Sequence, residues 1–189
     1  MMSSQVESIY QGTLLADAAY IDFGWVWEDA GLDPDKVQGG IPASAMEEFQ
    51  KRGFTEDQFN AFRERYEIID HVQSNLSGLS ATLFRDRFND GKPILAFRGT
   101  ETTLNAAPAD FITDLLLTLG IDEAGMQAPG QEGLMDEWRD AGHFSPDNPL
   151  TVVGHSLGGH AGSVGAGYRG HSQLFHLSSF QAESSLLRR

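Results

Sequence analysis

The sequence predicts an α/β protein in which one sheet packs against helices. Stretches with apolar residues at helical spacing alternate along the chain with short apolar runs of the kind that form buried strands. Two of these runs, 93–97 and 150–153, are separated by a segment with helical spacing at 131–141. Because a helical crossover returns the chain to the same edge of a sheet, these two strands are expected to be parallel.

Size and composition predict a single globular domain. The chain has 189 residues, of which 40% are hydrophobic and 10% aromatic, enough for one substantial core. Its formal net charge of −14 argues against nucleic acid and against anionic membrane surfaces as partners. The absence of cysteine excludes disulfides and thiolate chemistry, and nothing in the sequence calls for a metal or another cofactor.

Neither a membrane span nor a signal peptide is visible. No apolar run approaches the roughly 20 residues that a transmembrane helix needs. The first residues lack the basic and apolar regions of a secretory signal. Within the domain 1–189 we distinguish a helical and loop region at 1–66, a core at 67–165 and an atypical tail at 166–189.

The N-terminal region begins with a predicted helix at 6–23, whose apolar stripe is expected to lie across the sheet. Residues 24–52 are broken repeatedly by glycine and proline, which predicts irregular structure. Trp25 and Trp27 lie in this segment and are open to two interpretations. Their large apolar surface favours a place in the core, whereas long loops often form lids or binding loops.

A second helix and three strands are expected next. Thr55 and Gln58 have the spacing of a capping box, which predicts a helix over 55–66. Residues 67–97 are expected to form three antiparallel strands, because Asn89-Asp90-Gly91-Lys92 is a strong hairpin signal.

The motif with a candidate catalytic nucleophile follows the expected strand at 150–153. It is Gly154-His155-Ser156-Leu157-Gly158, a G-x-S-x-G pattern. A serine on a sharp turn between strand and helix needs neighbours without side chains two positions away on each side. Such a turn exposes the Ser156 hydroxyl as a nucleophile and directs the Leu157 N–H toward a developing oxyanion.

A second motif, Arg98-Gly99-Thr100, follows the strand at 93–97. Together the two motifs resemble the class 3 lipases, a group of α/β-hydrolases that includes bacterial lipases and esterases. The resemblance implies that Thr100 supplies the second oxyanion donor, while Arg98 is expected to be structural. It also implies an α/β-hydrolase-type, mostly parallel sheet with flanking helices, incomplete in this chain at its C-terminal end.

Residues 109–115 are also similar to the family, and the resemblance gives Asp114 a structural role. The apolar residues between 111 and 119 have a wide apolar face at helical spacing. This face fits a buried core helix, which is the commoner case, or alternatively a lid or acyl-binding wall.

The resemblance further implies a catalytic triad in the order serine, acid, histidine. Glu183 is the one acidic residue after Ser156, and no aspartate follows it. The histidines in that stretch are His160, His171 and His176. His176, at the end of an expected strand, is the candidate base, with His171 as an alternative. The geometry that a triad demands favours a third possibility, that none of them acts as the base. We therefore expect a truncated or fragmentary hydrolase.

The resemblance implies hydrolysis of carboxylic esters, of the triacylglycerol lipase or esterase type, through an acyl-enzyme on Ser156. The expected substrate is a lipid or a small ester. The alternative is a catalytically inactive hydrolase remnant or a non-catalytic binding module. Similar bacterial lipases are often extracellular, but neither a signal peptide nor glycine-rich export repeats occur in this sequence, so location is left open, as is the oligomeric state.

Overall fold

The computed structural model describes residues 4–73, 80–98, 133–155 and 172–177. The helices are α1 (Ser4–Ala18), α2 (Phe23–Asp29), η1 (Ala43–Ala45), α3 (Met46–Lys51), α4 (Glu56–Arg65) and α6 (Leu134–Asp140). The strands are β1 (Gly39–Gly40), β2 (Tyr66–Gln73), β3 (Ser80–Asp86), β4 (Lys92–Phe97), β5 (Leu150–His155) and β6 (Ser172–Leu177).

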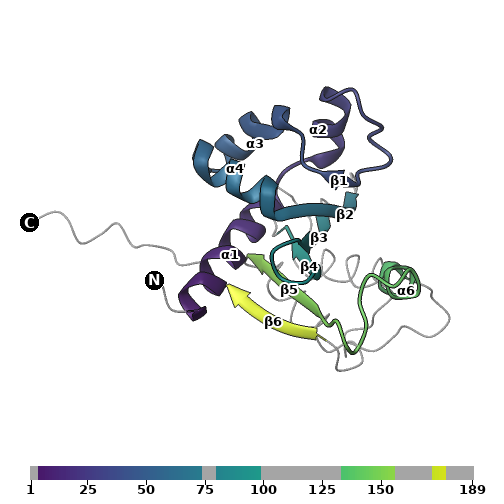
Figure 1. Cartoon of the computed structure of the whole chain (residues 1–189). Coiled ribbons are helices and arrows are strands. Elements are labelled where there is room, and N and C mark those ends of the chain that lie inside the picture. The colour runs from purple at the N-terminus through teal and green to yellow at the C-terminus, as the bar shows by residue number, and fades with distance from the viewer. Residues whose placement is uncertain (1–3, 74–79, 99–132, 156–171, 178–189) are drawn as a thin grey trace, which may run out of the picture.

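The described strands form one mixed sheet in the order β1-β2-β3-β4-β5-β6 (Figure 1). The pairs β1–β2, β2–β3 and β3–β4 are antiparallel, and the pairs β4–β5 and β5–β6 are parallel. The prediction of an α/β-hydrolase-type, mostly parallel sheet is therefore wrong. The narrower predictions of three antiparallel strands over 67–97 and of a parallel pair formed by 93–97 and 150–153 are confirmed.

A tight turn explains why the sheet is not mostly parallel. Only residues 87–91 separate β3 from β4, too few for a parallel crossover. Asp90 and Gly91 take positive φ angles of 53° and 70°, the backbone conformation that tight hairpins need and that glycine and aspartate tolerate. The hairpin signal Asn89-Asp90-Gly91-Lys92 predicts this turn, whereas the mostly parallel sheet was implied only by the family resemblance.

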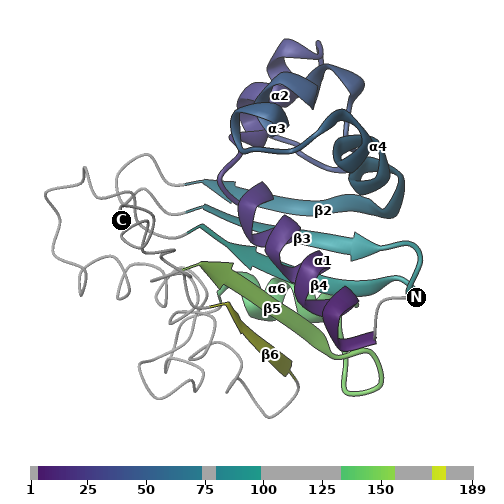
Figure 2. The same ribbon diagram turned by 90° about the vertical axis from the view of Figure 1, so that its left-hand side faces the viewer.

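Helices cover both faces of the sheet. α1 packs against β4, β5 and β6, as the expected helix across the sheet. Figure 2 shows α1 in front of the strands, α6 behind them, and α2, α3 and α4 grouped next to β2. Successive strand residues alternate between these layers, so that Phe84 joins the core on the α1 side while its neighbour Leu83 is buried outside that cluster.

The N-terminal region is more helical than predicted. α1 ends at Ala18, and the carboxylate of Asp22 accepts a hydrogen bond of 2.9 Å from the Trp25 N–H, which starts α2. Trp27 is buried in the core, as its size favours, but 48% of Trp25 is exposed. The capping box is confirmed, with Thr55 and Gln58 hydrogen-bonded to each other's backbone N–H groups.

A cluster of aromatic rings packs α2, α3 and α4, here called the helical group, against the sheet. Phe84 of β3 contacts Phe23 of α2 and Phe62 of α4, with ring centroids 6.0 and 5.8 Å apart. Phe62 also lies 5.3 Å from Phe49 of α3. These edge-on and tilted contacts suit the charge distribution of aromatic rings and pack the helices onto one face of the sheet. In the part of the chain that the structure describes, no helix has the length and apolar character to span a bilayer.

Candidate functional site

The sheet brings the two predicted motifs to one edge. β4 ends at Phe97 and β5 ends at His155, and Phe97 is the register partner of Gly154. Since neighbouring strands lie about 4.8 Å apart, the chain leaves β4 and β5 from adjacent positions at the same edge. The Arg98-Gly99-Thr100 and G-x-S-x-G motifs therefore begin side by side, at the carboxyl ends of two parallel strands.

Most of the predicted catalytic groups lie outside the described residues. These are the nucleophile Ser156 and the two oxyanion donors, Leu157 and Thr100. The alternative base His171 also lies outside the described residues, as do Asp114, with its expected structural role, His160 and Glu183. The structure therefore gives no geometry for the nucleophile or for either oxyanion donor.

The backbone of His176 is placed by the sheet. β6 runs parallel to β5, which confirms the expected strand around 174–177, and His176 is the register partner of Gly154. The candidate base therefore lies on the strand next to the one that leads into Ser156, one residue before the end of β6. The backbone of His176 thus lies at the edge of the sheet where β4 and β5 end, and its role as a base stays a prediction.

Arg98 is the last described residue after β4, and its contacts are structural. Its N–H donates a hydrogen bond of 3.0 Å to the Ser80 carbonyl, which extends the pairing of β3 and β4. Its guanidinium carbon lies 5.6 Å from the centre of the Tyr20 ring, within cation–π range. Arg52 lies 5.3 Å from the same ring and also donates to the Tyr20 carbonyl at 3.2 Å. The turn after α1 is thus tied to this edge of the sheet.

Sequence reasoning did not identify Ser80, at the start of β3. Only 1% of this residue is exposed, and its hydroxyl has no hydrogen-bond partner among the described residues. A buried hydroxyl without a partner costs about 1–3 kcal/mol. Ser80 lies in register with Gln73 and next to Arg98, at the edge where β4 and β5 end. No signal in the sequence separates such a serine from an ordinary one.

A separate cavity of about 310 Å³ is lined by residues of β1, β2 and β3 and by His143. Glu67 of β2 and Arg85 of β3 are its charged residues. Loss of surrounding water lowers the pKa of the His143 ring, and the positive charge of Arg85 lowers it further, against a smaller opposite effect of Asp70. The Arg85 guanidinium is paired with Glu67 at 2.8 Å. The pKa of His143 is thus below its ordinary value. None of the predicted motifs includes this residue.

The described residues contain no group of three or more histidine, aspartate or glutamate side chains placed to hold a metal ion. No protein-family model matches this chain, and no curated protein matches it.

Proposed function

We propose that this protein is a serine hydrolase of carboxylic esters, of the lipase or esterase type, with Ser156 as its nucleophile. The observation that carries the proposal is the register of β4 and β5, in which Phe97 faces Gly154. It places the starts of two motifs that are far apart in the sequence next to each other at one sheet edge.

Chain connectivity supports a shared site. Successive Cα atoms are 3.8 Å apart, so Ser156 lies within about 8 Å of Gly154, and Thr100 within about 11 Å of Phe97. This proximity supports a shared site, in which both N–H groups would donate to one substrate oxygen. An oxyanion hole requires two such donors on one oxygen, close to the nucleophile.

The proposed reaction has two halves. The Ser156 hydroxyl oxygen attacks the ester carbonyl, its proton passes to a base, and the Leu157 and Thr100 N–H groups hold the oxyanion. The alkoxide leaves with that proton as an alcohol, and an acyl-enzyme remains. Water then attacks the acyl carbonyl, which releases the carboxylic acid and restores the serine.

His176 is the proposed base. Its support is the parallel β5–β6 pairing, which sets it in register with Gly154. Proton transfer requires the His176 ring to lie within hydrogen-bond distance of the Ser156 hydroxyl, directly or through one water. We assign no acid partner to this base.

Labelling with a fluorophosphonate probe and turnover of p-nitrophenyl butyrate test the proposal. We expect Ser156→Ala to abolish labelling and to lower turnover by about a thousandfold or more. Ser44→Ala, in η1, is the matched control and should leave both unchanged. Turnover that persists in Ser156→Ala would exclude the serine mechanism. An intact, folded chain that neither labels nor turns over ester would instead favour a non-catalytic binding module.

The role of His176 needs its own readout. We expect His176→Gln to lower turnover and to remove the fall in activity on the acidic side of the pH profile, because the protonated form of a histidine base is inactive. His160→Gln is the control. If both variants keep the wild-type pH profile, the base is another group.

A further inference from the structure

Tyr20 lies in the turn between α1 and α2, and the core fixes its backbone. The Tyr20 N–H donates a hydrogen bond of 3.2 Å to the Asp17 carbonyl. The residues on either side, Ala19 and Ile21, belong to the hydrophobic core and are 0% and 2% exposed. The half-buried side chain of Tyr20 therefore extends from a backbone that close packing holds in one position.

Two arginines from distant parts of the chain contact the Tyr20 ring. The guanidinium carbon of Arg98, just after β4, lies 5.6 Å from the ring centre, and that of Arg52, just after α3, lies 5.3 Å from it. Arg52 also donates a hydrogen bond of 3.2 Å to the Tyr20 carbonyl, and its N–H donates to the Phe49 carbonyl at 3.0 Å. Arg52 thus ties Tyr20 to α3, and Tyr20 in turn contacts the residue that follows β4.

Arg98 has one contact with the sheet and one with the layer of helices. Its N–H donates to the Ser80 carbonyl of β3 at 3.0 Å, and its side chain lies against Tyr20. Thr100, the proposed oxyanion donor, is two residues further along the chain. Since successive Cα atoms are 3.8 Å apart, at most about 8 Å separates the Cα atoms of Arg98 and Thr100. The contact with Tyr20 therefore lies directly before one half of the proposed oxyanion hole.

The size of two effects decides what this contact can contribute. A partly exposed cation–π contact supplies only a small part of the total stability of a protein. In contrast, a displacement of about 1 Å in a group that acts on the substrate can lower a rate by about a hundredfold. A contact two residues from an oxyanion donor can therefore affect catalysis much more than folding.

We propose that Tyr20 is a positioning residue for the oxyanion hole. Its ring contact with Arg98 holds the start of the segment that leads to Thr100, and Arg52 supports Tyr20 in this role. The inference rests on the proposed hydrolase function and extends it to two residues, Tyr20 and Arg52, that lie outside both motifs. Because the face of the ring makes the contacts with both guanidinium groups, phenylalanine at position 20 should retain them.

The first test compares Tyr20→Leu with Tyr20→Phe in the turnover of p-nitrophenyl butyrate. The value of kcat is expressed per serine that the fluorophosphonate probe labels at completion, so that unfolded protein does not count. Tyr20→Leu should lower kcat by about tenfold or more and change KM by less than about twofold, because the oxyanion contact forms mainly in the transition state. Tyr20→Phe should keep kcat within about twofold of the wild type. Equal losses in both variants, or a loss in neither, would overturn the proposal.

Arg63 provides a matched control for Arg52. Its guanidinium carbon lies 5.8 Å from the centre of the Phe59 ring, and it donates a hydrogen bond of 3.1 Å to the Ile41 carbonyl, so it makes the same two kinds of contact. It lies near the start of β2, at the opposite end of the strands from Arg98, and it is less exposed than Arg52.

Replacement of Arg63 should therefore cost at least as much stability as replacement of Arg52. We nevertheless expect Arg52→Gln to lower kcat about threefold or more and Arg63→Gln to leave it unchanged. Equal effects on kcat would point to a general loss of rigidity and would contradict the positioning role.

Amide hydrogen exchange tests the inference without relying on activity. In Tyr20→Leu, the Arg98 N–H should exchange about fivefold faster or more, because its hydrogen bond to Ser80 opens more often. The Gly91 N–H is the control, since it donates to the Asp86 carbonyl at 3.0 Å in the hairpin at the other end of the strands, and its exchange should not change.

The two proposals fail separately. A wild-type chain that neither labels nor turns over ester would end the proposed hydrolase function, and the exchange rates would still show whether Tyr20 holds Arg98. Unchanged exchange at Arg98 in Tyr20→Leu, or an equal increase at Gly91, would overturn the positioning role even in an active enzyme.

Discussion

At the scale of single residues, the burial of a charged side chain determines how much its ion pair contributes to stability. The Asp86 side chain is 3% exposed and forms a double hydrogen bond with Arg65, at 3.0 and 2.8 Å. It also accepts a hydrogen bond from the Phe88 N–H at 3.0 Å. The Asp140 side chain is 74% exposed and forms its ion pair with Arg139 at the surface, where water and salt screen the charges.

We therefore expect Asp86→Asn to lower the free energy of unfolding by about 2 kcal/mol, because it leaves the Arg65 guanidinium without its buried counter-charge. Asp140→Asn, the control, should cost less than about 0.5 kcal/mol. Urea unfolding followed by far-UV circular dichroism measures both. Equal losses in the two variants would contradict the view that burial sets the difference.

His143 provides a prediction with a pH signature. Its pKa is lower in the folded protein than in the unfolded chain, mainly because burial disfavours its charged form. Below an unfolded pKa of about 6.5 the unfolded state therefore binds more protons, and stability falls as pH falls toward the folded pKa. Above about pH 7.5 the group is almost entirely neutral in both states and contributes little slope.

The difference in unfolding free energy between the wild type and His143→Gln, measured from pH 8 to pH 5, isolates this group from the titrating carboxylates. We expect the difference to level off above about pH 7.5 and to change below it, with the wild type losing stability relative to the variant. A difference that stays flat down to pH 5 would show that the folded pKa of His143 is not lowered.

At the scale of single helices, turns and strand pairs, short sequence patterns predicted the features that depend mainly on neighbouring residues. The capping box of Thr55 and Gln58, the turn at Asp90 and Gly91, and the parallel pair joined through α6 all follow from short stretches of sequence. The sequence pattern did not predict α2, because Gly24 and three aromatic residues obscure its helical spacing. Its start depends on one capping hydrogen bond, which the Trp25 N–H donates to the Asp22 carboxylate. The sheet class was wrong because strand direction across a whole sheet is a non-local property.

Two threonine variants, one in the capping box and one inside a helix, test how much the capping box contributes to stability. Thr55→Ala removes the acceptor that the Gln58 N–H uses at 3.2 Å and should cost about 1 kcal/mol of stability. Thr13→Ala in the interior of α1 is the control. The Thr13 hydroxyl donates to the Ile9 carbonyl at 3.0 Å, and alanine is the better helix former, so this change should be neutral or slightly stabilising. Thermal unfolding measures both, and a loss at Thr13 as large as that at Thr55 would refute the capping argument.

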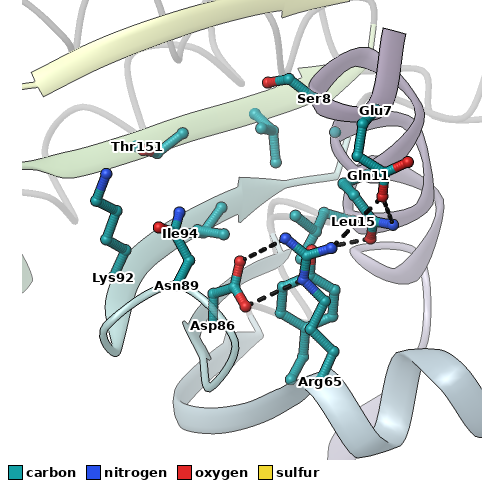
Figure 3. Close-up of a pocket in the computed structure, with 13 residues that line it drawn as sticks. Glu7, Ser8, Gln11, Leu15, Arg65, Asp86, Asn89, Lys92, Ile94 and Thr151 are labelled. Atoms are coloured by element: carbon teal, nitrogen blue, oxygen red, sulfur yellow. Dashed lines mark hydrogen bonds and ion pairs between the residues drawn. The ribbon is translucent and has the colours of Figure 1, made fainter. Parts of the chain in front are cut away.

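At the scale of the molecule, the sequence shows which residues are apolar but not which cavities remain between them. A cavity of about 330 Å³ between α1 and the sheet (Figure 3) is lined by Ser8 and Gly12 of α1 and by residues of β4 and β5, and its lining depends on how the helix crosses the sheet. The edge of the sheet where β4 and β5 end can be predicted from the sequence only in part. Its two motifs are visible in the sequence, but their proximity depends on the register of β4 and β5.

The aromatic cluster predicts that the helical group and the sheet unfold together. Phe84 is fully buried and contacts rings from α2, α4 and β2, so that its removal loosens both layers at once. Phe84→Ala should cost about 3–5 kcal/mol, the usual range for a buried phenylalanine. Phe88→Ala, at a position that is 65% exposed, should cost less than about 0.5 kcal/mol.

Two probes report on the two layers. Tryptophan fluorescence includes Trp27, buried in the helical group, and Trp138, whose indole N–H donates to Asp70 of β2 at 2.7 Å. In a Trp25→Phe background, which removes the third tryptophan, the variants Trp27→Phe and Trp138→Phe separate the two signals. Because the shared rings couple the layers, both signals should change at one urea concentration, in the wild type and, at a lower concentration, in Phe84→Ala. Separate midpoints for Trp27 and Trp138 would show that the helical group and the sheet are independent folding units and that the ring contacts do not join them.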